Sequence, residues 1–266
     1  MVSFNEFSTV PSLLRNVVEN IHKPEETFLI HKKNANWEEI SFKDTLLRAD
    51  SISAFFLERG IQKGDRLGLM IENSPEYVYY DQGIQQIGAI NTSIYPTLSE
   101  QEVAYIINDS GIKAILIGNP FLFKKILKIA DSCAELKYII PAFEGFEKVA
   151  IPSGLRAEII SYNILLSKSV SADEQKLINL RRREVLPSDV SSLIYTSGTT
   201  GTPKGVMLTH YNFVKNVEVC LQQIPVIDET ETFLSFLPLS HVFERTATYH
   251  VCCAQGCKMA FAQSLE

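Results

Sequence analysis

The sequence lacks the cysteine and histidine patterns that are typical of disulfide-bonded or metal-binding domains. Its five cysteines form an odd set without a C-x-x-C pair, and the histidines near them show no metal-ligand spacing. This argues against a disulfide framework and against a zinc site. Reduced, buried thiols are the expected state of the cysteines.

Long apolar runs are missing as well. No stretch approaches the roughly 20 apolar residues that a membrane-spanning helix needs. The first 14 residues show no basic start followed by an apolar run of signal-peptide length. We therefore expect a cytoplasmic protein.

Basic residues are fewer than acidic residues. The 266 residues contain 25 Lys and Arg against 31 Asp and Glu, which gives a formal net charge of −6. Non-specific binding to nucleic acid or to anionic lipid depends on clustered basic side chains, so no nucleic-acid partner is expected. Peripheral association with a membrane stays open. Any anionic ligand would have to be held by groups gathered locally.

What the sequence does contain is a globular α/β pattern, with enough hydrophobic side chains for one large core or two smaller ones. Short apolar stretches alternate with amphipathic segments, and helix-start signals precede them: Ser74-Pro75, the capping box from Ser99 to Glu102, and Asn119-Pro120. The strands expected in this part are 67–71, 89–94, 112–117 and 138–140. Crossovers between such strands build a parallel sheet that is buried on both faces.

The alternation weakens between residues 141 and 187 and then begins again. The elements expected in the first stretch are a strand near Ile159 and a helix over 173–183; those expected later are strands at 190–196, 206–208, 232–237 and 258–262, and helices after Thr209 and over 240–255. We therefore expect an α/β fold with two parallel-sheet subdomains. Residues 1–187 would form the first with a connecting region, and residues 188–266 the start of the second.

The segment from Tyr195 to Gly205 carries the strongest chemical signal. Its glycines allow the backbone to approach a bulky anion, its hydroxyls add donors, and Lys204 adds a positive charge. The spacing is neither that of a Walker A loop nor that of the dinucleotide fingerprint. A plain flexible turn is the alternative, but the ordered pattern [ST]-G-[ST]-T-G-x-P-K-G is expected by chance at only about 10⁻⁷ over this length. The segment therefore predicts a site for a polyphosphate tail.

The ten residues TSGTTGTPKG, 196–205, resemble the phosphate-binding signature of the adenylate-forming superfamily, which includes acyl-CoA synthetases, luciferases and peptide-synthetase adenylation domains. The likeness extends over residues 37–78 and 83–118, which resemble the opening blocks of the family. LPLSHVFER, at 237–245, is similar to a segment of long-chain fatty acyl-CoA synthetases. Nearly the whole chain is covered.

The resemblance implies a ligase of fatty acid metabolism that uses ATP, Mg²⁺ and coenzyme A. The residues that would bind the β- and γ-phosphates are Thr196, Ser197, Gly198, Thr199, Thr200, Gly201, Thr202 and Lys204. Among these, the Thr196 hydroxyl would be a Mg²⁺ ligand and Lys204 the catalytic residue. His241 would lie near the acyl pocket, with a helix-start histidine bonded to the backbone as the alternative.

The family also uses parts that are missing from this sequence: a Tyr-Gly-x-Thr-Glu-like segment, a ribose-binding Asp, a hinge and a C-terminal lysine. On this resemblance we expect a truncated N-terminal part of a longer synthetase, inactive by itself. Two other functions stay open. One is adenylation of an aryl or amino acid, and the other is a non-catalytic module that binds a nucleotide or an acyl ligand.

Overall fold

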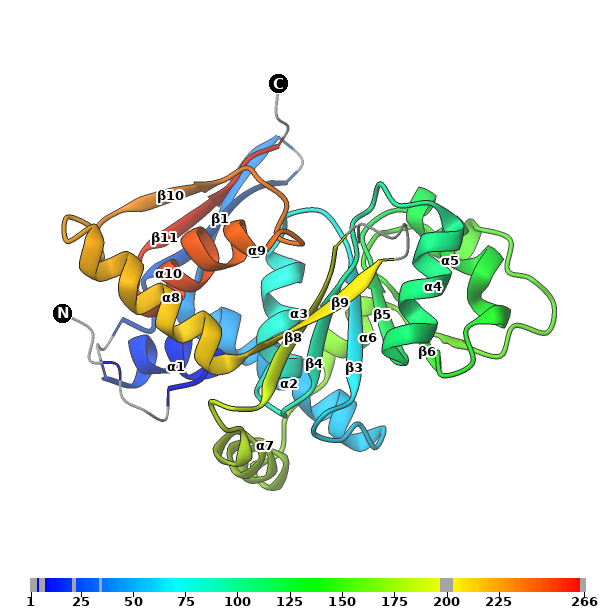
Figure 1. Ribbon diagram of the computed structural model, residues 1–266, viewed down its shortest axis with the longest axis horizontal. Helices are drawn as coiled ribbons and strands as arrows, with labels where there is room; N and C mark the ends of the chain where they lie inside the picture. Colours follow the sequence, from blue (N-terminus) through cyan, green and yellow to red (C-terminus); the bar gives the residue numbers. More distant parts are fainter. Residues whose placement is uncertain (1–3, 5–7, 21–22, 34, 197–202, 264–266) are drawn as a thin grey trace.

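Two β-sheets with helices packed around them form the fold (Figure 1). The computed structural model describes residues 4, 8–20, 23–33, 35–196 and 203–263. A seven-stranded sheet has the order β7-β6-β5-β3-β4-β8-β9, and a four-stranded sheet has the order β10-β11-β1-β2. The mixed α/β class with parallel sheets that the sequence predicts is confirmed.

The larger sheet is parallel except at one edge, where β8 and β9 run antiparallel. Its strands are β3 (Arg66–Met70), β4 (Ile90–Ser93), β5 (Ile112–Ile117), β6 (Tyr138–Pro141), β7 (Glu158–Ile159), β8 (Val190–Thr196) and β9 (Lys204–Thr209). Each expected strand of this sheet is present to within two residues at either end. Strand β5 is covered on both faces, and this burial explains why its sequence is an apolar run and does not alternate.

Helices surround this sheet (Figure 1). They are α2 (Phe42–Glu58), α3 (Pro75–Gln85), α4 (Glu100–Ser110), α5 (Pro120–Ile129), α6 (Tyr162–Ser167) and α7 (Ala172–Glu184), with single 3₁₀ turns at Ala130–Ser132 and Phe146–Lys148. The capping box of α4 is present, and the Asn119 side chain accepts from Leu122 N. Ser74 occupies the N-cap of α3 without a side-chain bond, so Pro75 starts that helix by its fixed φ.

Helix α3 lies between the two sheets and is buried along most of its length (Figure 1). A Cβ on Gly83 would lie 2.8 Å from Ala49 O and from Ile52, so the glycine is needed for the close approach of α2. The main core cluster joins α3 to the smaller sheet, with Tyr80 from the helix and Phe28 and Met259 from the strands.

The smaller sheet consists of β1 (Thr27–Lys33), β2 (Asn36–Ser41), β10 (Thr232–Ser235) and β11 (Lys258–Phe261). Strand β1 is missing from the sequence prediction, because only three apolar residues precede a charged end. In Figure 1 the blue β1 lies beside the red β11, to which it is parallel. The boundary expected after residue 187 does not separate the sheets. Strands β8 and β9 extend the larger one, and β10 and β11 pair with β1 through contacts between distant segments that no local pattern shows.

The remaining helices are α1 (Val10–Asn20), α8 (His210–Gln223), α9 (Val242–Glu244), η3 (Arg245–His250) and α10 (Val251–Gln255). The single helix expected over 240–255 is a continuous helical segment from Val242, but η3 within it is a π-helix. The strand expected to reach residue 237 ends at Ser235. Among the described residues, no helix is both long and apolar enough to span a bilayer.

Candidate functional site

The hairpin of β8 and β9 brings two of the predicted phosphate-binding residues together. Thr196 and Lys204 are the last paired residues of this ladder, and both are exposed. Directly opposed residues of an antiparallel pair project from the same face, with Cβ atoms about 5 Å apart. The structure therefore places a hydroxyl and an ammonium group side by side. Ser197, Gly198, Thr199, Thr200, Gly201 and Thr202 lie outside the described residues, and their role stays a prediction.

Gly205 has a packing role on the opposite face of the hairpin, which differs from the anion approach expected from the sequence. Gly205 does not have the positive φ that a turn glycine needs. A Cβ at this position would instead lie 3.0 Å from Tyr195 Cζ. The Tyr195 hydroxyl donates to Asp109 Oδ2 at 2.6 Å, so the ring is fixed across the glycine and ties the hairpin to α4. Burial and this hydrogen bond raise the pKa of Tyr195, which keeps the phenol neutral.

An apolar groove with a volume of about 510 Å³ adjoins the Thr196 end of the hairpin. Alternate residues of a strand share a face, so the hairpin contributes one wall on the side of Thr196. Helix α8 and the segment that starts at Val242 supply the other walls. The lining residues are Ile194, Thr196, Val206, Leu208, Asn212, Phe213, Asn216, Cys220, Val242, Phe243, Thr246 and Ala247. A mainly hydrocarbon wall suits an apolar ligand.

His241 lies beside this groove without lining it. The histidine is exposed and caps α9, where its Nδ1 accepts from Phe243 N at 3.2 Å. That bond is the one expected of a helix-start histidine. The next two residues, Val242 and Phe243, do line the groove. Contact of His241 with an acyl chain therefore stays a prediction.

Asn73, which the sequence analysis did not single out, fixes the segment before His241. Its Oδ1 accepts from Leu239 N at 2.7 Å, and its Nδ2 donates to Leu237 O at 2.6 Å and to Ser235 Oγ at 2.9 Å. Asn73 stands in the turn after β3, so these bonds hold residues 235–239 against the larger sheet. A short turn motif gives no sign of partners more than 160 positions away.

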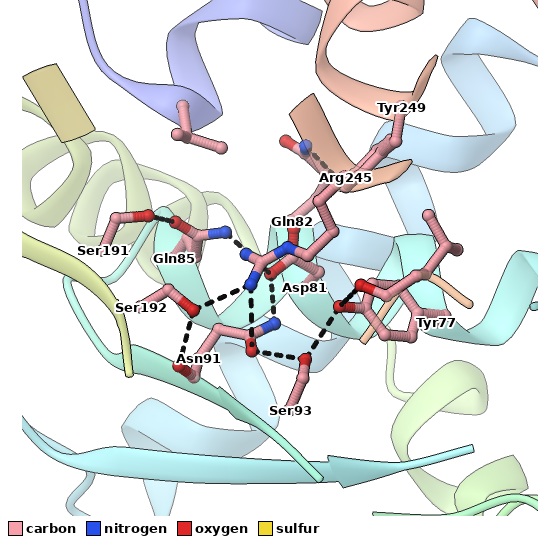
Figure 2. A network of polar contacts seen from close by, with 12 residues as sticks. Tyr77, Asp81, Gln82, Gln85, Asn91, Ser93, Ser191, Ser192, Arg245 and Tyr249 are labelled. Atoms are coloured by element: carbon pink, nitrogen blue, oxygen red, sulfur yellow. Dashed lines mark hydrogen bonds and ion pairs between the residues drawn. The ribbon is translucent and has the colours of Figure 1, made fainter. Parts of the chain in front are cut away.

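A buried polar network joins α3, β4, β8 and η3 and was also missed (Figure 2). Its centre is Arg245, whose side chain is fully enclosed and lies 3.5 Å from Asp81 Oδ1. Asp81 Oδ1 also accepts from Asn91 Nδ2 at 2.6 Å and from Gln85 Nε2 at 2.7 Å. The Tyr77 hydroxyl and Ser93 Oγ extend the network, 2.8 Å apart. Burial raises the pKa of Tyr77 to about 12, so its phenol is neutral at physiological pH.

Two buried histidines are close to this network. Burial lowers the pKa of His210 to about 4 and that of His250 well below its usual value. His210 Nδ1 accepts from Val10 N at 3.3 Å, as a neutral ring can. The ring of His250 packs edge-on against Phe213, with centroids 5.0 Å apart. Both histidines therefore serve as neutral packing groups at pH 7.

The cysteines match the sequence expectation. All five are free, and four of them are buried. Burial raises the pKa of the Cys252 and Cys253 thiols well above the ordinary value, so neither is an activated nucleophile. Among the residues that the structure describes, no group of three or more His, Cys, Asp or Glu side chains could hold a metal ion.

The family model described as "AMP-binding enzyme" matches residues 18–266, which is almost the whole chain. The chain belongs to this family. Fatty acyl-CoA synthetase A of Dictyostelium discoideum is 31% identical over 225 residues, which are 84% of this chain and 32% of that protein. A long-chain-fatty-acid–CoA ligase of Bacillus subtilis is 29% identical over 239 residues, 84% of this chain and 41% of that protein.

Among solved structures, an anthranilate CoA ligase in complex with anthranoyl-AMP has the same fold. Its TM-score is 0.77 at 20% identity, and the match covers 97% of this chain and 45% of that one. At this identity the likeness establishes the fold alone. The chain spans about a third to two-fifths of the curated relatives described above.

Proposed function

We propose that this chain is the nucleotide-loop part of an ATP-dependent fatty acid:CoA ligase, which forms an acyl-adenylate and then an acyl-CoA. The observation that carries the proposal is the pairing of Thr196 with Lys204 next to an apolar groove. A hydroxyl and an ammonium group suit the phosphates of ATP, and apolar walls suit a hydrocarbon chain. A fatty acid whose carboxylate points towards Thr196 would meet the nucleotide there.

The chemistry explains why the two ligands need adjacent sites. One carboxylate oxygen attacks the α-phosphorus of ATP, which forms the acyl-phosphate bond and breaks the bond to pyrophosphate. The thiol of coenzyme A then attacks the acyl carbon, and AMP leaves. Both reactants of the first step are anions, so catalysis depends on positioning and charge neutralisation.

In this proposal the residues from Thr196 to Thr202 bind the β- and γ-phosphates, and Lys204 offsets the charge of the departing pyrophosphate. His241, next to the groove, would border the acyl chain. The proposal concerns the full-length enzyme, and we expect the 266-residue chain alone to be inactive.

Magnesium fits this site as part of a nucleotide complex. Thr196 offers one exposed hydroxyl, and no ready-made cluster of metal ligands exists among the described residues. Mg²⁺ commonly takes its other ligands from waters and substrate phosphates. Once bound, the ion would neutralise phosphate charge, with the Thr196 hydroxyl as its protein ligand.

The apolar character of the groove favours a fatty acid over the other acids. An aryl acid is the second candidate, because the same fold binds anthranoyl-AMP in a solved relative. A module that binds a nucleotide or an acyl ligand without chemistry is the third. A cytoplasmic location is part of this proposal, because the five cysteines are free thiols and four of them are buried.

Acid-dependent exchange of labelled pyrophosphate into ATP by the full-length protein tests the proposal. Palmitate, octanoate, benzoate, anthranilate and aspartate should be compared at equal concentration. We expect the highest rate with a fatty acid. Exchange with benzoate or anthranilate alone would favour the aryl alternative, whereas MgATP binding by calorimetry without exchange for any acid would favour the non-catalytic module.

A further inference from the structure

The ion pair of Arg245 and Asp81 is poorly suited to stabilise the fold by itself. Both side chains are fully buried, and their closest approach is 3.5 Å. Desolvation offsets much of the attraction in such a pair, so its presence is weak evidence for stability. Arg245 Nε and the second oxygen of Asp81 also have no hydrogen-bond partner among the described residues. The pair therefore calls for an explanation other than stability.

One contact of Arg245 reaches the strand that leads to the phosphate-binding segment. Its Nη1 donates to Ser192 Oγ at 2.7 Å, and Ser192 Oγ donates to Asn91 O at 3.0 Å. Figure 2 shows the guanidinium group between Asp81 and these residues. Strand β8 pairs with β4 only over residues 192–194, so beyond this point its sole strand partner is β9. Ser192 is the first of the three residues that pair β8 with β4, and the Tyr195–Asp109 bond holds the end of the strand to α4.

The backbone of Arg245 belongs to another wall of the groove. Arg245 N donates to His241 O at 3.2 Å, and the groove is lined by the residues on either side, at 242–243 and 246–247. Arg245 also begins the π-helical turn, a rare conformation that is frequent at functional sites. Within this turn Arg245 bonds to the network, while Thr246 and Ala247 line the groove. A single side chain therefore connects the two walls.

We propose that Arg245 is a positioning residue for adenylation. By holding Ser192, it sets the spacing between the phosphate-binding end of β8 and the groove wall formed by residues 242–247. It touches neither substrate, because it is completely enclosed. This inference rests on the proposed function, in which the carboxylate and the α-phosphate must meet between those two walls.

Two variants of the full-length enzyme test the positioning role. Arg245→Lys keeps the charge but loses the forked geometry. Ser192→Ala removes the hydroxyl that accepts from Arg245, together with its bond to Asn91 O. Misplacement by an ångström can cost up to about 100-fold, so we expect kcat for pyrophosphate exchange to fall at least about tenfold in Arg245→Lys. Ser192→Ala should lose less. Since the phosphate contacts remain, the KM for MgATP should stay within about threefold.

Amide hydrogen exchange without substrates provides the second measurement. Residues 193–196 and 204–207 should exchange faster in both variants. Ser53→Ala is the matched control, because Ser53 is a fully buried serine of α2. Its hydroxyl bonds to Gly83 O and Ala49 O and accepts from Gln86 Nε2, away from the hairpin. This control should lower stability but leave both kcat per folded molecule and exchange in β8 unchanged.

The positioning role would be overturned if folded Ser192→Ala had the wild-type kcat or unchanged amide exchange. If Arg245→Lys does not fold, the Ser192→Ala variant decides the question. A larger KM for MgATP with unchanged kcat would also contradict it. If the wild-type enzyme adenylates no acid, the proposed function fails, but hydrogen exchange still decides separately whether Arg245 anchors β8.

Discussion

The two sides of the larger sheet are held together by different kinds of contact. Beside α4 and α5 the interior is almost wholly apolar, and Phe123 packs edge-on against Phe143 and Phe146. Beside β8 the interior contains an enclosed arginine, an aspartate and several hydroxyl and amide groups (Figure 2). The apolar side depends on volume and pattern, whereas the polar side depends on the direction of individual bonds. The comparison suggests that the first side supports the fold and the second side orients the site.

Removal of the Phe123 ring should have the largest effect on the apolar side. Phe123 is fully buried, and loss of a buried phenyl group with the cavity it leaves costs about 3–5 kcal/mol. Urea unfolding should show this loss, while exchange activity per folded molecule stays unchanged. Phe121→Ala on the same helix is the control, since Phe121 is 69% exposed and should cost far less. A large activity loss in folded Phe123→Ala would break the contrast between the two sides.

Lys204→Ala should have the opposite profile. Loss of one charged group at a site of developing charge costs about 100-fold in rate, so pyrophosphate exchange by the full-length enzyme should fall by this order. The side chain is exposed, and its removal should change the free energy of unfolding by no more than about 0.5 kcal/mol. Lys124→Ala, an exposed lysine of α5, should change neither quantity. An unfolded Lys204→Ala protein would indicate a structural role instead.

Acid should weaken the fold through the buried histidines of the polar side. The pKa of His210 falls from 6.5 to about 4 on folding, so the unfolded state binds a proton first as the pH falls below about 6.5. The free energy of unfolding is therefore highest above that pH and falls progressively towards pH 4. Between pH 7 and pH 5 the loss is about 2 kcal/mol for His210, and His250 shifts in the same direction.

Urea midpoints at the two pH values measure this loss, and His210→Gln should reduce the slope. The sequence contains no histidine from residue 32 to residue 209, so α4 and α5 carry no such group. An equal pH dependence in His210→Gln would contradict the assignment.

Removal of the Ser99 cap should have the smallest effect. Its hydroxyl accepts from Glu102 N in a complete capping box, and loss of such a cap costs about 1 kcal/mol. Ser161→Ala is the matched control, because Ser161 precedes α6 without a side-chain cap bond. Thermal unfolding should separate the two variants, and equal midpoints would show that the capping box contributes little.

Several elements could be predicted because their signals are local. The four strands expected from 67 to 140 were predicted from apolar runs and helix caps, and the structure confirms them. The Gly-rich segment was found by its order of residues. Strand β1 could not be found, because its burial depends on β11, more than 200 positions later. Likewise, nothing near Asn73 indicates that it holds Leu239, and the sequence around Arg245 gives no sign of Ser192.

The sequence by itself determined the alternation of strands and helices, the phosphate-binding signature and the family. These depend on periodicity, capping and residue order within short windows. Only the tertiary structure decided which strands share a sheet, that Thr196 and Lys204 stand side by side next to an apolar groove, and that Arg245 reaches β8. The physical reason is that pairing and buried polar bonds join residues far apart in the chain, and their geometry exists only after the backbone has folded.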